Sequence, residues 1–443
     1  MKDNFIATMA SCCDLPAEIL EVIFKYLDGW SFSKTKEVCK SWYIITKELQ
    51  KDQRLWRTFC VNEIPEGVIE DVVSFKSIPF KDLIMDWSNV YRRWHKGKMI
   101  KSKNFLIKNI QAFCSNPVTC MKISGSWIIT GHSNGYILVW NLNTGKLDSK
   151  HRVHLSTVTD MALVDLLNLD SYYGFKDLPW SHHHIITGSK DSSIRILSLL
   201  EDIDYSDHNL FLNEHGDAIK SIRIFGGKFV ASSRDNTITL WSLDVKKKPS
   251  LRVDAKLLQT IIGPEDYLLE LGFWYDKIYC ISHANQLYTY NMKNEWLKQP
   301  YFKSNWLEIS RRRFIVTAIR VFRDQIIIMF TACAKMIVFI DERNYKVYFL
   351  MLTLHTPIVS IALHGTILAL GLENGKLYLY YIPNNKALLE LDLACPTFQS
   401  MLSEASIVSV DVVYNYDSPT VVASTTESLF VVKWNKSRFD VSH

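Results

Sequence analysis

The first hundred residues place their apolar side chains at helical intervals. A helix start at 14–16 leads into one apolar stripe, and Asp28-Gly29 ends that segment. A second helix is expected at about 33–48, a third apolar cluster follows at 55–59, and residues 80–95 predict a further helix. The first stripe comprises Ile19, Leu20, Ile23, Phe24 and Leu27. We therefore expect a small helical domain followed by a helical linker.

After residue 104 the apolar positions change from a helical period to alternation, which is typical of β-strands. Four segments repeat one pattern, in which an Asp or Asn stands six residues before a Trp, Leu or Tyr. They are residues 129–140, 186–197, 230–241 and 368–380. Weaker copies at 278–290, 327–339 and 421–434 keep two strands but lose the polar residues of the pattern. Seven copies predict seven similar β-sheets in a repeating fold.

The strand expected at 105–113 has no repeat of its own. The last copy, at 407–434, supplies three strands instead of four. Pairing of residues 105–111 with this last copy would join both ends of the repeat region in one sheet. Because a closed ring leaves no open sheet edge at its junction, we expect this pairing to complete the fold.

The composition is that of a globular protein. The 443 residues are 48% hydrophobic and 22% charged, which excludes disorder of the whole chain. A net charge of +5 is too small to make nucleic acid the expected main ligand. No segment reaches the roughly 20 apolar residues of a membrane span, and no signal peptide is expected. Nine scattered cysteines without a C-x-x-C pair indicate free thiols in the cytoplasm or the nucleus.

No catalytic or metal-binding pattern stands out in the sequence. The chain holds no phosphate-binding loop, no H-E-x-x-H and no G-x-S-x-G, so we expect no enzymatic activity, cofactor or metal. His182-His183-His184 falls in an expected loop insertion and indicates a solvated loop rather than a metal site. The basic runs at 246–248 and 311–313 fit either a nuclear-import signal or ordinary surface loops. The basic stretch at 96–103 is interpreted as a solvated linker end rather than a nucleic-acid site.

Residues 15–56 resemble the F-box, a helical module. The matching residues are Leu15-Pro16-x-Glu18, Ile23-Phe24-x-Tyr26-Leu27, Val38-Cys39-Lys40-x-Trp42 and Leu55-Trp56. In that family the module binds Skp1, the adaptor of a Cullin-1/RING ubiquitin ligase of the SCF type. An amphipathic helix in a partner's groove binds through apolar anchors. The resemblance implies that these anchors are Leu15, Pro16, Ile19, Leu20, Ile23, Val38 and Trp42.

The repeats resemble WD repeats, which form the blades of β-propellers. In that family an upstream His often joins the turn Asp, a Ser or Thr and the Trp in one hydrogen-bond network. The histidines of this chain that can do so are therefore interpreted as structural. They are His154, with Thr187 and Asp191, and His215, with Asp235 and Trp241, where Ala231 occupies the Ser/Thr position.

WD propellers present two positions of each blade on one face, one just before the turn Asp and one early in the innermost strand. These positions hold Ser133, Lys190 and Arg234, and Thr119, Thr159 and Lys220. The resemblance implies that Lys190, Lys220 and Arg234 gather there. Related F-box/WD proteins bind phosphorylated motifs through such basic side chains. The set includes a single Arg and blades four to seven add none, so a phosphate site and a chance basic cluster both remain open.

The sequence therefore predicts a multidomain chain with an F-box domain at 12–60, a helical linker at 61–104 and an all-β, seven-bladed WD40-type β-propeller at 105–435. The resemblance implies the substrate-recognition subunit of an SCF ubiquitin ligase. Its helical domain would bind Skp1 and, through it, Cullin-1 and the RING subunit, while the propeller would bind a protein substrate. The alternative is a WD-repeat scaffold that binds Skp1 without promoting degradation. Neither nucleic acid nor a membrane is expected as a partner.

Overall fold

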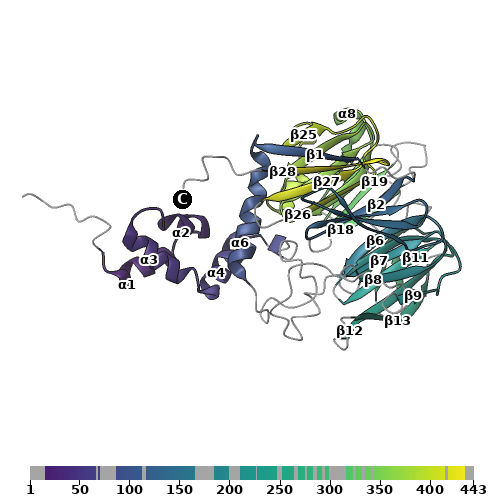
Figure 1. Ribbon diagram of the computed structural model, residues 1–443, viewed down its shortest axis with the longest axis horizontal. Coiled ribbons are helices and arrows are strands. Elements are labelled where there is room, and N and C mark those ends of the chain that lie inside the picture. The colour runs from purple at the N-terminus through teal and green to yellow at the C-terminus, as the bar shows by residue number, and fades with distance from the viewer. Residues whose placement is uncertain are drawn as a thin grey trace, which may run out of the picture.

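The computed structural model describes residues 15–65, 68–69, 86–111, 116–164, 184–198, 210–225, 227–246, 252–263, 268–274, 277–282, 287–291, 295–298, 316–322, 326–331, 335–340, 344–414 and 418–434. A small helical module lies beside a large body of β-sheets, and helix α6 (Trp87–Lys96) stands between them (Figure 1). Among the described helices, none is long and apolar enough to cross a membrane.

The helical module contains α1 (Ala17–Lys25), α2 (Gly29–Thr35), α3 (Lys40–Leu49) and α4 (Gln53–Glu63). The expectation of a single second helix at about 33–48 is wrong, because this segment contains the end of α2 and most of α3, which are separate helices. The carboxylate of Asp28 accepts the N–H groups of Trp30 and Ser31 at 3.0 and 2.8 Å and thereby begins α2 where the sequence suggested only an end. The buried hydroxyls of Thr35 and Thr46 are 2.6 Å apart and hold α3 back against α2.

Helix α6 belongs to the core of this module. Its apolar residues at 87, 90, 91 and 94 follow a helical spacing and are buried in one cluster with Phe32 and Trp56. The helix begins at Asp86, whose carboxylate accepts the N–H of Asn89 at 3.1 Å. Most of the further helix expected at 80–95 is therefore present as α6, while its first residues, 80–85, lie outside the described part of the chain.

Seven four-stranded antiparallel sheets follow. Six of them are formed by four consecutive strands, and the seventh combines the first strand of the chain with the last three. Blade one holds β2 (Val118–Ser124), β3 (Trp127–His132), β4 (Tyr136–Asn141) and β5 (Leu147–Arg152). Blade two holds β6 (Val158–Val164), β7 (His184–Ser189), β8 (Ile194–Ser198) and β9 (Leu210–Leu212). Blade three holds β10 (Ile219–Phe225), β11 (Lys228–Ser233), β12 (Thr237–Lys246) and β13 (Arg252–Ile262). Blade four holds β14 (Leu268–Trp274), β15 (Lys277–Ser282), β16 (Leu287–Asn291) and β17 (Glu295–Lys298).

Blade five holds β18 (Val316–Phe322), β19 (Ile326–Thr331), β20 (Lys335–Phe339) and β21 (Tyr345–Phe349), followed by the short helix α8 (Leu350–Thr353). Blade six holds β22 (Ile358–His364), β23 (Ile367–Leu372), β24 (Lys376–Tyr381), helix α9 (Asn385–Leu389) and β25 (Phe398–Met401). Blade seven holds β26 (Ser409–Tyr414), β27 (Pro419–Ser424) and β28 (Ser428–Trp434). The weak sequence copies at 278–290, 327–339 and 421–434 thus form paired strands, as predicted.

Strand β1 (Phe105–Gln111) is the fourth strand of blade seven. It pairs antiparallel with β28, from Phe105 opposite Trp434 to Gln111 opposite Ser428. The strand that precedes all the repeats therefore completes the last one, as expected from the missing fourth strand. This pairing covers an edge of β28 that would otherwise be open.

Apolar clusters connect neighbouring blades around the whole ring. Ile110, Ile128 and Leu429 share one cluster between blades seven and one. A second cluster joins blades five and six through Ile328 and Leu368, and others join the remaining neighbours. The seven sheets consequently form a closed propeller, in which each blade buries its faces against the next.

Because closure depends on β1, a polar residue on the buried side of this strand is expected to destabilise the whole propeller. Ile110 is 5% exposed, whereas Leu106 on the same strand is 57% exposed. We expect Ile110→Asn to lower the free energy of unfolding by about 2–4 kcal/mol and Leu106→Asn to change it by less than about 0.5 kcal/mol. Urea unfolding of both variants checks this, and equal losses would contradict the closure by β1.

Candidate partner-binding surfaces

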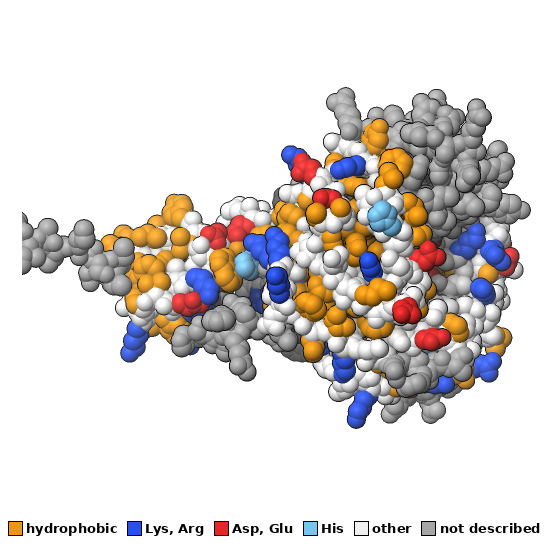
Figure 2. Space-filling view, turned by 90° about the horizontal axis from the view of Figure 1, so that it is seen from above, with side chains coloured by type: hydrophobic (Ala, Val, Ile, Leu, Met, Phe, Trp, Pro, Cys, Tyr) orange, Lys and Arg blue, Asp and Glu red, His pale blue; other side chains and the backbone are white. Residues whose placement is uncertain are grey.

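The helical module presents an exposed apolar surface along α1. Four of the predicted Skp1 contacts form part of it: Leu15, Ile19, Ile23 and Val38 are 39%, 48%, 40% and 57% exposed. Pro16 is also exposed and stands at the start of α1. Figure 2 shows hydrophobic side chains gathered over the helical module. An apolar surface of this kind on a small module is typical of a protein-binding site.

Two predicted contacts do not belong to the exposed surface. Leu20 is 2% exposed and lies in the core of the module, so its predicted partner contact stays a prediction that the exposed surface does not include. The reason is the helical period, since Leu20 and Phe24 share the inner side of α1, while Ile19 and Ile23 share the outer side. Trp42 is half-buried, and its ring stands edge-on to Phe24 at 4.9 Å.

The sequence interpretation missed two residues of the same surface. Val22 is 51% exposed and Tyr26 is 87% exposed. With Ile19 and Ile23 they occupy positions i, i+3, i+4 and i+7 of α1, which form one continuous stripe. The sequence analysis placed Ile19 and Ile23 in one stripe with the inward-facing Leu20 and Phe24, and so did not extend the outer side to Val22 and Tyr26.

A rigid neck connects this module to the propeller. The Glu63 carboxylate accepts the N–H of Gly29 at 2.7 Å and the hydroxyl of Tyr91, which ties α2 to α6. The rings of Trp30 and His95 stack with centroids 4.2 Å apart. These contacts fix α6 against the F-box helices. Burial, followed by the charge of Lys98, lowers the pKa of His95 to about 4.

The other end of the neck is buried in the propeller. The 3₁₀ helix η3 (Gly97–Lys101) follows α6 directly, and its Ile100 is 1% exposed in a cluster with residues of blades six and seven. Gly97 packs so closely on Thr366 and Tyr414 that a Cβ atom would overlap both side chains. The linker predicted at 61–104 thus ends in η3, which is packed on the propeller and is not a free connection.

The histidine networks are structural, as interpreted, but they differ in detail. In blade two, His154 Nε2 is 2.9 Å from Thr187 Oγ1, and His154 Nδ1 is 3.4 Å from Asp191. In blade three, His215 Nε2 is 2.9 Å from Thr239 Oγ1. Thr239 thus supplies the hydroxyl that Ala231, at the usual Ser/Thr position, lacks. Because Thr239 lies on the neighbouring strand β12, the sequence pattern did not reveal it.

Blade one forms its network around a histidine that the sequence interpretation did not consider. His132 Nε2 is 2.9 Å from Thr130 Oγ1, which also accepts the indole N–H of Trp140 at 3.1 Å.

The solvated loop expected at 182–184 is wrong for His184, which is 2% exposed at the start of β7. His182 and His183 lie outside the described residues. No group of three or more described His, Cys, Asp or Glu side chains is placed to hold a metal ion.

The turn positions of four blades are equivalent in the structure. The N–H groups of Ser133, Lys190, Arg234 and Glu373 each donate to the carbonyl that stands just before the innermost strand of the same blade, at Pro117, Thr157, Ala218 and Pro357. These four side chains therefore project from the same end of the propeller. Glu373 is exposed at the equivalent position of blade six, and the set predicted from the sequence did not include it.

The three predicted basic residues are only partly brought together. Burial and then the charge of Arg234 lower the pKa of Lys220, which indicates that these two side chains lie near each other. Lys190 is exposed on the neighbouring blade, and the described contacts do not join it to the other two. The exposed carboxylates Glu214 and Asp217 lie on the adjoining loop. This face therefore has mixed charge and is not a purely basic phosphate site.

The expected face threonines are used for contacts within the fold. Thr119 Oγ1 lies within hydrogen-bond distance of the carbonyls of Gly131 and Val158, at 3.0 and 2.6 Å. Thr159 Oγ1 donates to the Gly188 carbonyl at 3.0 Å. Thr119 thereby connects blade one to blade two.

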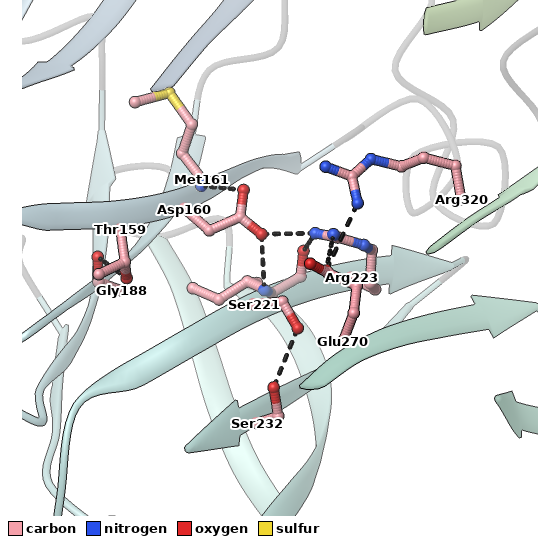
Figure 3. Close-up of polar contacts among 10 residues, drawn as sticks. Thr159, Asp160, Met161, Gly188, Ser221, Arg223, Ser232, Glu270 and Arg320 are labelled. Atoms are coloured by element: carbon pink, nitrogen blue, oxygen red, sulfur yellow. Dashed lines mark hydrogen bonds and ion pairs between the residues drawn. The ribbon is translucent and has the colours of Figure 1, made fainter. Parts of the chain in front are cut away.

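A chain of charged side chains crosses the innermost strands of blades two to five (Figure 3). The guanidinium of Arg223 binds Asp160 on one side and Glu270 on the other, with 2.6 Å to Glu270, and Arg320 is 3.4 Å from Glu270. Asp160 also accepts the N–H of Ile222 at 3.0 Å. Burial alone would raise the pKa of Asp160, but the positive charges of Arg223 and Arg320 hold this pKa below its ordinary value. These residues link the inner strands of four neighbouring blades.

Comparisons with known proteins agree with this geometry. Residues 12–62 match the family described as F-box-like, and residues 106–141 match the family described as WD domain, G-beta repeat. The chain combines an F-box-like domain with WD repeats. The expected membership in the F-box/WD-repeat proteins is thereby confirmed, together with the fold class.

Several curated proteins are similar to parts of this F-box/WD-repeat chain. Protein ROOT INITIATION DEFECTIVE 3 of Arabidopsis thaliana is 28% identical over 187 residues, which are 39% of this chain and 35% of the relative. WD repeat-containing protein pop1 of Schizosaccharomyces pombe is 22% identical over 302 residues, 51% of this chain and 38% of the relative. F-box/SPRY domain-containing protein 1 of Drosophila erecta is 37% identical over 67 residues, 15% of this chain and 25% of the relative. The chain thus spans well under half of the length of each of these relatives.

Arg223 is expected to be essential for the inner ring of the F-box/WD-repeat chain. Its replacement in Arg223→Met leaves Asp160 and Glu270 facing each other without the intervening cation. Because these side chains are 15–18% exposed, we expect a loss of about 2–4 kcal/mol of unfolding free energy. The exposed Arg152→Met serves as the control and should cost less than about 0.5 kcal/mol.

A triple variant distinguishes a lost ion pair from lost packing at Arg223. Asp160→Asn/Arg223→Met/Glu270→Gln removes all three charges, so it should be more stable than Arg223→Met alone. Chemical unfolding measures both variants. An Arg223→Met protein as stable as the unmodified protein would show that the charged chain contributes nothing.

The neck should weaken on acidification. The pKa of His95 in the folded protein, about 4, lies below its ordinary value. The neutral imidazole therefore stabilises the fold above about pH 6.5, and this contribution is lost as the pH falls from about 6.5 through about 4. His95→Phe keeps a ring against Trp30 but cannot take up a proton. Urea unfolding should show a smaller loss between about pH 7 and about pH 5 for His95→Phe than for the unmodified protein; equal losses would contradict this role.

Proposed function

We propose that this protein is the substrate-recognition subunit of an SCF-type ubiquitin ligase. Its F-box domain binds Skp1 and, through it, Cullin-1 and the RING subunit, while its propeller binds the protein to be ubiquitinated. The observation that carries the proposal is the exposed apolar stripe of α1 (Ile19, Val22, Ile23 and Tyr26) on a domain that matches the F-box-like family. A stripe of this spacing suits a helix that docks in a partner's groove.

The proposed contribution to ubiquitin transfer is proximity and not bond chemistry. The neck of α6 and η3 is packed at both ends, so it holds the Skp1-binding surface at a fixed position relative to the propeller. A substrate bound on the propeller would then be kept near the ligase at a high effective concentration. The proposed non-catalytic role agrees with two domain families that generally mediate interactions.

We propose that the substrate binds at the end of the propeller that carries Lys190, Lys220 and Arg234. Exposed apolar side chains stand beside these positions. Leu155 is 78% exposed, and its N–H donates to Asp191 at 2.8 Å. Ile262 is 76% exposed and pairs with Thr237 close to Arg234. Apolar anchors within a rim of mixed charge are typical of a surface that binds a polypeptide.

Skp1 binding is the first test of this proposal. We expect Ile19→Asp/Ile23→Asp to weaken binding of purified Skp1 by at least about 100-fold, because two apolar anchors are replaced by charges that would have to be desolvated. Ile262→Asp introduces the same charge at an exposed apolar position of the propeller and should leave the affinity unchanged. Isothermal titration measures all three proteins. An unmodified protein that does not bind Skp1 would overturn the ligase proposal.

The same double variant separates a ligase subunit from the alternative, a scaffold that binds Skp1 without promoting degradation. If the protein delivers substrates, cells that carry Ile19→Asp/Ile23→Asp should accumulate proteins that remain bound to its propeller. Proximity labelling from both forms, combined with measured protein half-lives, identifies them. Skp1 binding without any stabilised partner would favour the scaffold.

A further inference from the structure

The positive charge of this chain is concentrated in one segment. Residues 87–147 contain nine Lys and Arg residues and neither Asp nor Glu, whereas the whole chain carries a net charge of +5. The rest of the chain is therefore net negative. Six of the nine basic residues lie within 92–103 and are named here the basic collar. They are Arg92, Arg93, Lys96, Lys98, Lys101 and Lys103.

The lysines of this stretch at 98, 101 and 103 are exposed, as at a solvated linker end, but the stretch is packed on the propeller and is not a free connection. Lys98 and Lys101 belong to η3, whose Ile100 is buried in the propeller. Residues three apart in a 3₁₀ helix lie on the same side, so both ammonium groups project together. Lys98 Nζ lies 5.2 Å from the ring centre of Trp94, and Lys101 Nζ lies 4.4 Å from that of Tyr381. The collar is thus a fixed surface in which aromatic rings support the lysines.

Four of the six residues of the collar are available to a partner. Arg92, Lys98, Lys101 and Lys103 are exposed, and none forms an ion pair with an acidic side chain in the described part of the chain. Glu390, which follows α9, is instead 3.4 Å from Lys386. Figure 2 shows Lys and Arg side chains gathered where the helical module meets the propeller.

Apolar side chains continue this surface onto the first strand of the propeller. Phe105 and Leu106 follow Lys103 after one intervening residue, Asn104, and are 39% and 57% exposed. Further along β1, Lys108 Nζ donates to the carbonyls of Asn143 and Thr144 at 2.9 and 2.6 Å. Basic residues interleaved with exposed apolar ones suit a ligand that carries both carboxylates and apolar groups. A single-stranded nucleic acid would instead favour open aromatic rings for base stacking, and Trp94 is only 8% exposed.

We propose that the basic collar binds an acidic polypeptide segment that also carries apolar side chains. The segment would lie across α6, η3 and the beginning of β1, between the Skp1-binding helices and the propeller. The carboxylates would pair with Arg92, Lys98 and Lys101, and the apolar groups would cover Phe105 and Leu106. This site is separate from both surfaces of the proposed function and does not depend on either of them.

The test uses the full-length protein and a fluorescently labelled peptide rich in Glu with interspersed Leu. Arg92→Glu/Lys98→Glu/Lys101→Glu should weaken its binding by at least about tenfold and flatten the dependence of affinity on salt. The matched control, Lys150→Glu/Lys256→Glu/Lys376→Glu, makes the same change in net charge at exposed lysines of three different blades. It should change the affinity by less than about twofold, since exposed charges far from the ligand are screened. Fluorescence anisotropy measures all affinities.

Two further arms decide between ligands and exclude misfolding. Single-stranded and double-stranded oligonucleotides of the same net charge should bind the unmodified protein more weakly than the peptide does. The proposal is overturned if an oligonucleotide binds more tightly, or if both triple variants lose peptide affinity equally. Skp1 binding is recorded for the same samples. Its retention in the collar variant shows a folded protein, and its absence from the unmodified protein would overturn the proposed function alone.

Discussion

The pairing of β1 with β28 is the constraint on which the rest of the structure depends. A propeller buries its blades only against each other, so one missing strand leaves both an open edge and an uncovered cluster. Here the closing strand comes from the opposite end of the repeat region, from Phe105 opposite Trp434 to Gln111 opposite Ser428. Ile110 contributes to this closure through the apolar cluster between blades seven and one.

The same strand also fixes the position of the helices. Only residues 102–104 separate η3 from β1, so the closure of the ring anchors the neck. At its other end, α6 belongs to the core of the F-box domain and is tied to α2 through Glu63. Ring closure, neck and F-box domain therefore form a continuous packed path. A continuous path of this kind allows an adaptor to hold one partner at a fixed place relative to another.

The charged chain through Arg223 strengthens the ring where the repeats are least regular. Blades two and three keep the histidine networks of WD repeats, with His154 and His215 at their centres. The sequence copies of blades four and five have lost the corresponding polar residues. Ion pairs from Asp160 to Arg320 cross these blades at their inner strands and supply polar contacts of another kind.

Much of this architecture could be predicted from the sequence, because it follows from local periodicity. The alternation of strands, the seven copies and the closing strand at 105–111 depend on patterns within short segments. The separate helices α2 and α3 could not be predicted, since they depend on the capping by Asp28 and on the long-range bond between Thr35 and Thr46. The charged chain was also missed, because its members are neighbours only after the ring has closed.

The surfaces were predicted less completely than the fold. Periodicity located the F-box helix, but it did not distinguish the buried side of α1, with Leu20, from the exposed side, with Ile23. At the propeller, the turn positions were located correctly. The charge around these turn positions also depends on neighbouring loops, such as the one with Glu214 and Asp217. The position of this loop relative to Lys220 follows only from the folded chain.

The central claim is that the F-box domain is held at a fixed position relative to the propeller. The most direct test is a distance measurement by pulsed electron paramagnetic resonance, with spin labels attached through non-canonical amino acids at the exposed positions Lys47 and Lys376. These positions lie in the helical module and in blade six. The account predicts one narrow distance distribution for the full-length protein. A broad or multiple distribution would show that the neck bends freely, and would contradict the account.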